Sequence, residues 1–304
     1  MKIRIATRKS KLALWQARHV SQKLELLDTV SGVELVPLST RGDEILDKSL
    51  QKIGGKGLFI KELEVAMRSG DADIAVHSMK DVPTEIQAGF CIAAMLKRAD
   101  PSDAFVSNGV TLSGLAAGAT IGSSSLRRQA QLKALRPDID VLPLRGNVDT
   151  RLAKLDKGEF DAIILATAGL ERLGLAERIT EKFSPSHMLP ATAQGVIGIE
   201  CLANRDDLLP VLAELQDQSS ALTTAAERAV AETLNANCQS PVACFATMSG
   251  GRMTVHGLVA TPDGRTLLRE SAEGEAADAI LLGRAVAQQL LDAGAAGLLA
   301  ELSA

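Results

Sequence analysis

The sequence predicts an α/β protein with parallel or mixed sheets, followed by a smaller α+β region with an antiparallel sheet. Short apolar runs alternate with helical patterns from Ile3 to Cys201, a rhythm typical of sheets covered by helices. Two turn signals, Gly250-Gly251 and Pro262-Asp263-Gly264, separate three strand patterns near the C-terminus. With 304 residues, the chain is also long for a single hydrophobic core, so we expect two or three domains.

Individual elements of the first part follow from periodicity and caps. Apolar residues recur at steps of three and four after Ser10, which predicts an amphipathic helix from a Ser10 cap to about Asp28. A second helix is expected around Leu63 and should end at Gly70. We expect strands at residues 3–7, 33–39, 73–78, 89–95, 104–107, 119–122, 140–144, 161–167 and 197–201.

From Asp207 the pattern changes to two helices, the second over residues 221–234. Strands are then expected at residues 245–248, 253–260 and 266–270. A helix over residues 276–291 and a short one after Gly294 complete the chain. Charge and proline at residues 97–103 and 183–190 oppose burial, so these segments are candidate crossings between domains.

Composition argues against several classes of function. The net charge is -4 and the pI about 5.7, so no overall positive field attracts nucleic acid or an anionic membrane. Aromatic residues make up 2% of the chain, too few for the stacking platforms that bind single strands. The N-terminus has no signal-peptide core, and no run approaches the roughly 20 apolar residues of a spanning helix. We expect a cytoplasmic protein without nucleic-acid or membrane partners.

The cysteines and histidines indicate neither a disulfide framework nor a metal site. The four cysteines form no CxxC pair, and we expect Cys91 and Cys201 to be buried in strands. The four histidines lack metal-ligand spacing, so no metal is expected. Cys238 differs because it lies in a loop, Asn235–Pro241, where a small molecule could reach the thiol. An unreactive loop cysteine is an equally good interpretation, and Cys244 shows that cysteine is tolerated nearby.

The stretch Asp73–Pro83 places polar side chains at the carboxyl end of an expected strand, where open α/β sheets bind ligands. On this stretch alone, a polar turn with a capping Asp81 and a solvated Lys80 is the simpler interpretation. In a basic pocket, however, the Asp81 carboxylate would be suited to stabilise a transient organic cation and to shuttle protons. His77 could act as a base, but a single histidine at a strand end is more often structural.

Basic residues occur repeatedly where a strand leads into a helix. A helix N-terminus carries partial positive charge, so cations there are locally unfavourable. One such residue could be a solvated arginine, but repetition at the same edge of the sheets indicates a bulky polyanionic ligand. Neighbouring hydroxyls, such as those of Ser10 and Ser125, suit phosphates or carboxylates. The basic residues are Arg8, Lys9, Arg127, Arg128, Arg145, Arg151 and Arg172.

Ordered motifs along nearly the whole chain carry a resemblance to a known family. They include HSMKDVP at residues 77–83 and CQSP at residues 238–241. The others lie at residues 5–10, 40–43, 54–59, 103–107, 124–129, 144–148, 150–151 and 168–170. In this order they resemble the porphobilinogen deaminases, also called hydroxymethylbilane synthases.

The resemblance implies two periplasmic-binding-protein-like α/β domains with mixed sheets and a C-terminal α+β domain with a small antiparallel sheet. Domain 1 would comprise residues 1–98 and, because the chain crosses twice, residues 191–213. Domain 2 would comprise residues 99–190, with the arginine-rich face. Domain 3, residues 214–304, would carry the cofactor cysteine on a loop.

The resemblance also implies a transferase that deaminates four porphobilinogen molecules and joins them head to tail. The chain would grow on a dipyrromethane cofactor attached to Cys238 through a thioether. Release of hydroxymethylbilane would serve tetrapyrrole and haem biosynthesis. Asp81 and Lys80 would be catalytic, and the enzyme would be a monomer. The alternative is a non-catalytic two-domain binding protein for a polyanion, which would use the arginines but neither Asp81 nor a modified Cys238.

Each pyrrole of such a ligand carries an acetate and a propionate, which would account for the polyanion site. Besides Cys238, the expected cofactor contacts are Lys80, Asp81, Ser125, Arg127, Arg128 and Arg145. The expected substrate contacts are Arg8, Ser10, Arg145, Arg151, Arg172 and Gln194. Lys56 and Phe59 would face the cleft from a mobile lid over residues 43–57. Many members have Gly-Gly before the cofactor cysteine; here Ala236-Asn237 precede it and Ser240 replaces a valine, a departure that concerns the loop's backbone and not the thiol.

Overall fold

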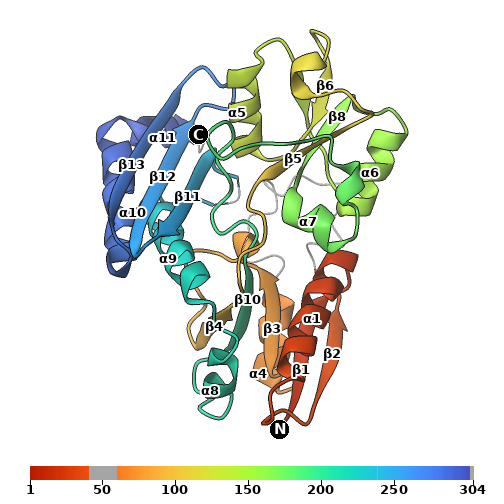
Figure 1. The fold of residues 1–304 in the computed structure, drawn as a ribbon, viewed down its shortest axis with the longest axis vertical. Helices are drawn as coiled ribbons and strands as arrows, with labels where there is room; N and C mark the ends of the chain where they lie inside the picture. Colours follow the sequence, from red (N-terminus) through yellow and green to blue (C-terminus); the bar gives the residue numbers. More distant parts are fainter. Residues whose placement is uncertain (41–59, 238, 302–304) are drawn as a thin grey trace. The chain divides into compact units, whose positions relative to one another are not determined.

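The computed structural model of the chain describes residues 1–40, 60–237 and 239–301, which form two compact units (Figure 1). Unit 1 comprises Met1–Arg98 and Val196–Ala221, and unit 2 comprises Ala99–Gly195 and Leu222–Ala304. This division does not separate residues 99–190 from the C-terminal region, so the three-domain arrangement stays a prediction. Within the described residues, no helix is long and apolar enough to span a bilayer.

Unit 1 contains a five-stranded mixed sheet in the order β2-β1-β3-β10-β4. Its strands are β1 (Lys2–Arg8), β2 (Gly32–Leu38), β3 (Ile74–Ser78), β4 (Phe90–Met95) and β10 (Ile197–Leu202). The first three are parallel, whereas β10 runs antiparallel to both β3 and β4. The returning segment of the chain therefore supplies an interior strand of this sheet.

Helices cover both faces of this sheet. On one face, Val20 and Leu24 of α1 (Lys11–Leu24) pack in one core with Leu212 of the short helix α8 (Leu209–Ala213). On the other, α4 (Lys61–Ser69) contributes Leu63 and Met67.

Of the two helix ends predicted in unit 1, those of α1 and α4, the structure confirms one and contradicts the other. The predicted end of α1 near Asp28 is wrong, because the chain turns after Leu24 to start β2 and Leu27 reaches the core from that turn. The predicted end of α4 at Gly70 is confirmed. That glycine closes the helix in the left-handed region with φ 79°.

Unit 2 begins with a second five-stranded sheet in the order β7-β6-β8-β5-β9. Its strands are β5 (Asp103–Ser107), β6 (Thr120–Gly122), β7 (Asp140–Leu142), β8 (Ala162–Ala166) and β9 (Glu181–Lys182). β7 ends before the expected residue 144 because Pro143 cannot donate to the sheet. The two-residue β9 carries no apolar pattern, so the sequence does not predict it.

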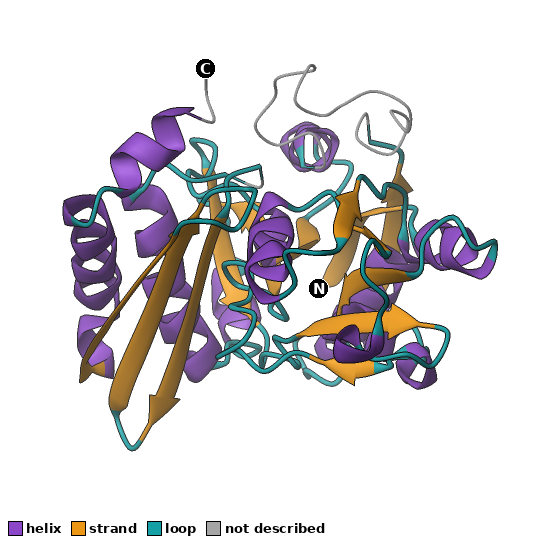
Figure 2. Cartoon of the chain, turned by 90° about the horizontal axis from the view of Figure 1, so that it is seen from above, coloured by secondary structure: helices purple, strands orange, loops and turns teal. Residues whose placement is uncertain are grey.

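A three-stranded antiparallel sheet, β11 (Val242–Ser249), β12 (Arg252–Ala260) and β13 (Leu267–Glu275), completes unit 2. Helices α9 (Gln218–Thr233), α10 (Ala279–Asp292) and α11 (Ala295–Glu301) cover one face (Figure 2). Gly257 permits close packing there, because a Cβ would lie 2.6 Å from Val286 Cγ1.

Helix α5 (Leu126–Leu135) lies between the two sheets of unit 2. Leu132 packs in a core of the five-stranded sheet, whereas Ala130 packs with Phe245 and Leu258 of the small sheet. The other helices, α6 (Val148–Asp156) and α7 (Thr167–Arg172), pack on the opposite face of the five-stranded sheet. An α/β fold with two mixed sheets and a small antiparallel sheet is therefore confirmed.

Candidate active site

Two parallel strands of unit 1, β1 and β3, end at the same edge of the sheet. After β1, the Ser10 side chain caps α1 by accepting a hydrogen bond from the Ala13 backbone N–H. After β3, a 3-10 turn, η1 (Met79–Asp81), carries Asp81. A small cavity at this edge is lined by Arg8, Ser10, Gln16, Ile60, Val76, His77, Ser78 and Asp81, among others. The structure thus brings together three of the predicted site residues, Arg8, Ser10 and Asp81.

Strand β10 fixes the turn that carries Asp81. Met79 is buried against Gly198, where a Cβ would lie only 2.1 Å from the Met79 sulfur. The Met79 backbone N–H donates to the Val196 carbonyl at 3.0 Å, and the Val82 N–H donates to the Met79 carbonyl at 3.2 Å. Lys80 is half-buried and Asp81 is exposed. The turn is therefore anchored by its buried residue while Asp81 stays accessible to a ligand.

His77 has a buried carboxylate partner beside this turn. Its Nε2 lies 2.9 Å from Glu200 Oε2 on β10, and the two side chains are 6% and 2% exposed. The pKa of nearby Glu64 is raised, first by burial and then by the negative charge of Glu200. The interpretation of His77 as a structural histidine at a strand end agrees with this contact.

Arg127 and Arg128, predicted to meet a polyanion, are both buried against Asp103 of β5. Arg127 Nη1 donates to Asp103 Oδ2 at 2.6 Å, and Arg128 Nη2 donates to Asp103 Oδ1 at 2.6 Å. Arg128 Nη1 also donates to the Ile164 carbonyl at 3.0 Å. Burial by itself would raise the pKa of Asp103, but the two guanidinium groups hold it well below its usual range.

Gln194 joins the same cluster. Its Nε2 donates to Asp103 Oδ1 at 3.0 Å and to the Pro101 carbonyl at 2.7 Å. Three other predicted residues of unit 2 bind backbone carbonyl groups or cap a helix. Arg172 donates to the Gly195 carbonyl at 2.7 Å, Arg151 Nε donates to the Gly146 carbonyl at 2.7 Å, and Ser125 caps α5.

Arg172 differs from the expected position. It lies in the last turn of α7, where the helix dipole stabilises a cation, and not at the start of the helix. Burial lowers the pKa of Arg172 to about 10, so the side chain is still a cation at neutral pH. Arg145 and Arg151, at the start of α6, are half-buried. These three side chains remain candidates for binding carboxylates.

Sequence reasoning gave no role to two acidic residues that organise these contacts, Asp103 and Glu200. Each lies in a strand whose other residues are almost all apolar and buried. An ionisable residue in such a strand needs a charged or hydrogen-bonding partner. That signal was visible in the sequence, but it could not tell which arginine or histidine would be the partner.

Comparison with known proteins identifies the family. Residues 3–210 match the family described as "Porphobilinogen deaminase, dipyromethane cofactor binding domain", and residues 221–292 match "Porphobilinogen deaminase, C-terminal domain". The chain belongs to the porphobilinogen deaminase family. A porphobilinogen deaminase of Chromobacterium violaceum is 56% identical over 304 residues, which cover 100% of this chain and 98% of the relative. One of Stenotrophomonas maltophilia is 54% identical over 298 residues, 98% of each chain.

Comparison with solved structures gives matches at much lower similarity. The VFT2 domain of Bordetella pertussis BvgS (F375E/Q461E) is 14% identical with a TM-score of 0.44, over 70% of this chain and 86% of that one. As a porphobilinogen deaminase family member, the protein is a transferase with a dipyrromethane-binding domain. This family membership opposes the alternative of a non-catalytic binding protein.

The residues present fit a dipyrromethane with acetate and propionate groups. Arg8, the last residue of β1, supplies a cation, and Ser10 at the start of α1 supplies a hydroxyl; Arg145 before α6 and Arg151 within it supply further cations. Guanidinium groups bind carboxylates through paired, charge-assisted hydrogen bonds. In charge and hydrogen-bonding capacity, these side chains therefore fit such a group.

Three predicted residues, Lys56, Phe59 and Cys238, lie outside the described residues. The residues flanking Cys238 are described, and Asn237 organises them. Its side-chain oxygen accepts a hydrogen bond from the Gln239 N–H at 2.8 Å, and its own N–H donates to Ser240 Oγ at 3.1 Å. Asn237 and Ser240, two of the three residues that depart from the resembled family's pattern, thus hydrogen-bond to each other from either side of Cys238 in the sequence.

Proposed function

We propose that Asp81 is the catalytic carboxylate of this deaminase and that Cys238 carries its dipyrromethane. The observation that carries the first assignment is the cavity shared by Asp81, Arg8 and Ser10 at the end of β1 and β3. An accessible carboxylate beside a cation and a hydroxyl can hold a substrate with both an amine and carboxylates. Lys80, next to it on the same turn, would contact a substrate or cofactor carboxylate.

Porphobilinogen carries an aminomethyl group on its pyrrole ring. When the C–N bond breaks and ammonia leaves, the ring and its methylene carbon carry positive charge, which Asp81 would stabilise. The new C–C bond forms at the free α-carbon of the terminal pyrrole, and Asp81 would accept the proton lost from that carbon. Four such additions, followed by hydrolysis, would release hydroxymethylbilane.

The arginines would bind the acidic side groups. Arg8, Ser10, Arg145, Arg151, Arg172 and Gln194 are proposed substrate contacts; Ser125, Arg127, Arg128 and Arg145 are proposed cofactor contacts. Arg127 and Arg128 already bind Asp103, so a cofactor carboxylate would either share their remaining N–H donors or displace part of that contact. We further propose the three domains given above, a lid that includes Lys56 and Phe59, and a cytoplasmic monomer.

The test combines intact mass with single-turnover kinetics on purified wild type, Asp81→Asn and Cys238→Ala. We expect Asp81→Asn to keep the mass of two pyrrole units but to consume porphobilinogen at least about 100-fold more slowly, the usual contribution of a general acid-base group. Cys238→Ala should lack that mass and any activity.

Two variants serve as controls. Asp71→Asn removes an exposed carboxylate just before β3 and should leave the rate unchanged. Cys244→Ser should keep the added mass. A rate for Asp81→Asn within about threefold of wild type would remove Asp81 from the chemistry, and mass retained on Cys238→Ala would place the cofactor on another residue.

A further inference from the structure

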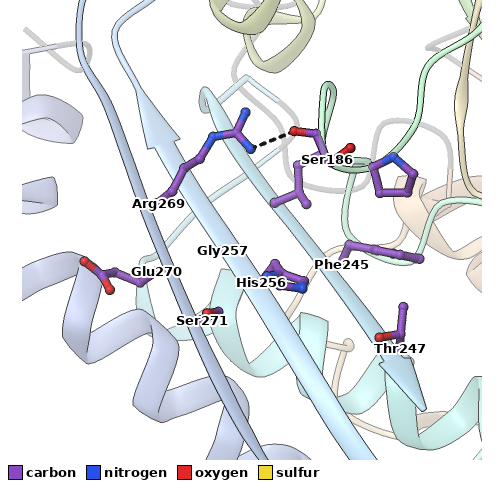
Figure 3. Close-up of a pocket in the computed structure, with 10 residues that line it drawn as sticks. Ser186, Phe245, Thr247, His256, Gly257, Arg269, Glu270 and Ser271 are labelled. Atoms are coloured by element: carbon purple, nitrogen blue, oxygen red, sulfur yellow. Dashed lines mark hydrogen bonds between the residues drawn. The ribbon is translucent and has the colours of Figure 1, made fainter. Parts of the chain in front are cut away.

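A second cavity, of about 540 Å³, lies in unit 2 and shares no residue with the cavity that holds Asp81. It lies on the face of the small sheet opposite α10, and Figure 3 shows side chains from β11, β12 and β13 around it. Pro185, Ser186 and Leu189 form its remaining wall. This volume lies within the range of pockets that bind small molecules.

The wall at Leu189 is held in place by side-chain hydrogen bonds. The Leu189 N–H donates to Gln131 Oε1 at 2.7 Å, and its carbonyl accepts from Arg127 Nη1 at 2.8 Å. Leu189 is 4% exposed and Phe245, on the sheet side, is 8% exposed. Leu189 and Phe245 belong to one apolar cluster, so this part of the cavity is pre-formed.

Arg269 supplies a positive charge beside these apolar groups. Its Nη1 donates to the Ser186 carbonyl at 3.3 Å, and among the described residues it forms no ion pair (Figure 3). Glu270 also lines the cavity, but it lies opposite Gly257 in the strand register and its side chain points away from Arg269 (Figure 3). Glu273, further along the same strand, binds Arg252 at 2.9 Å. Burial alone lowers the pKa of Arg269, with no carboxylate to oppose it.

We propose that this cavity binds a small aromatic carboxylate, whose carboxylate group pairs with Arg269 and whose ring packs on Phe245. The guanidinium has donors left for a bidentate contact with a carboxylate. A planar ring is suited to an offset or edge contact with phenylalanine. Hydroxyls of Thr247 and Ser271 and the ring of His256 lie within reach of further polar groups on such a ligand.

The probe is 4-fluorobenzoate, titrated into the holoenzyme and followed by ¹⁹F NMR. We expect saturable binding that Arg269→Gln weakens about tenfold or more, the loss typical of a charged hydrogen bond. Arg265→Gln removes a charge from the exposed turn before β13 and should leave the affinity unchanged. The neutral analogue 4-fluorobenzamide should bind at least about tenfold more weakly to the wild type.

A second variant tests the cavity without changing Arg269. Ser271→Trp, at a position on the edge strand, should fill the cavity and abolish binding while the thermal unfolding midpoint stays unchanged. Equal affinity of wild type and Arg269→Gln would overturn the proposal. So would equal affinity of wild type and Ser271→Trp, since the probe would then bind outside this cavity.

Discussion

A single carboxylate, Asp103, balances the charge of two buried guanidinium groups in unit 2. Asp103 is fully buried, and both Arg127 and Arg128 bind it at 2.6 Å. Removing one member of a buried charge cluster leaves the others desolvated and uncompensated, which costs about 3–5 kcal/mol. The side chain of Asp103 is therefore a main determinant of the stability of this cluster.

We expect Asp103→Asn to lower the free energy of unfolding by about 3–5 kcal/mol at pH 7. Because the pKa of Asp103 is lower in the folded than in the unfolded chain, its ionised form stabilises the protein above about pH 4. This contribution is lost as the pH falls further. The difference between wild type and variant, measured by urea unfolding, should thus be largest at neutral pH and shrink toward pH 3.

Asp156→Asn is the matched control for Asp103→Asn. It breaks an exposed ion pair with Arg178 in the same unit. Exposed pairs contribute little, so its loss of unfolding free energy at pH 7 should be far smaller. If the difference in unfolding free energy between wild type and Asp103→Asn grew on acidification, that result would contradict the charge argument.

At the scale of elements, the antiparallel pairing of β10 with β3 determines where Asp81 lies. Gly198 pairs with His77 and leaves room for Met79, the first residue of the turn that carries Asp81. An added Cβ would meet the Met79 sulfur at 2.1 Å and its Cγ at 3.0 Å, both far inside normal contact. Strand and turn are therefore fitted to each other through one glycine.

Gly198→Ala should destabilise the protein by about 1–3 kcal/mol and lower the turnover of porphobilinogen, because Met79 must shift the Asp81 turn. Thermal unfolding and steady-state kinetics would measure both effects. Gly32→Ala is the matched control, since a Cβ there meets no atom within 4 Å. The double variant Gly198→Ala/Met79→Ala should regain part of the activity. Wild-type kinetics for Gly198→Ala would show that the turn tolerates displacement.

Most elements could be predicted from local sequence, because their signals are local. The Ser10 cap, the Gly70 stop and the glycine turns of the small sheet all follow from neighbouring residues. The insertion of β10 between β3 and β4 could not be derived this way, since strand order depends on contacts far apart in sequence. The family resemblance suggested that residues 191–213 return to domain 1, but not the place of the returning strand in the sheet.

Prediction of the candidate site was also limited to features that neighbouring residues determine. Periodicity placed Arg8, Ser10 and Asp81 at strand ends, and the structure brings them to one cavity. Arg127 and Arg128 lie at the start of a helix, where a cation indicates a nearby anion. From the sequence pattern, we would expect that anion to be a bound ligand. Asp103, more than twenty residues away along the chain, is the anion that the pattern could not supply.

At the scale of the whole molecule, unit 1 is built from two segments that the sequence separates. Strand β10 is interior to its sheet, and its residues Ile199 and Cys201 are completely buried in the main core. The Leu96 N–H donates to the Ile197 carbonyl at 2.9 Å, so the departing and returning chains run side by side. Residues 1–98 alone would expose an edge of β3 and an edge of β4 and would lack part of the apolar core.

We therefore expect a chain of residues 1–98 joined to residues 196–221 by a short Gly-Ser linker to unfold cooperatively as a domain. Residues 1–98 alone should fail to do so, because β3 and β4 lack the strand between them. Circular dichroism during thermal unfolding and the dispersion of amide NMR signals would distinguish the two chains. If both chains folded equally well, β10 would be dispensable for the sheet. If neither did, unit 1 would need the rest of the protein, and the interior strand would not be sufficient to complete its core.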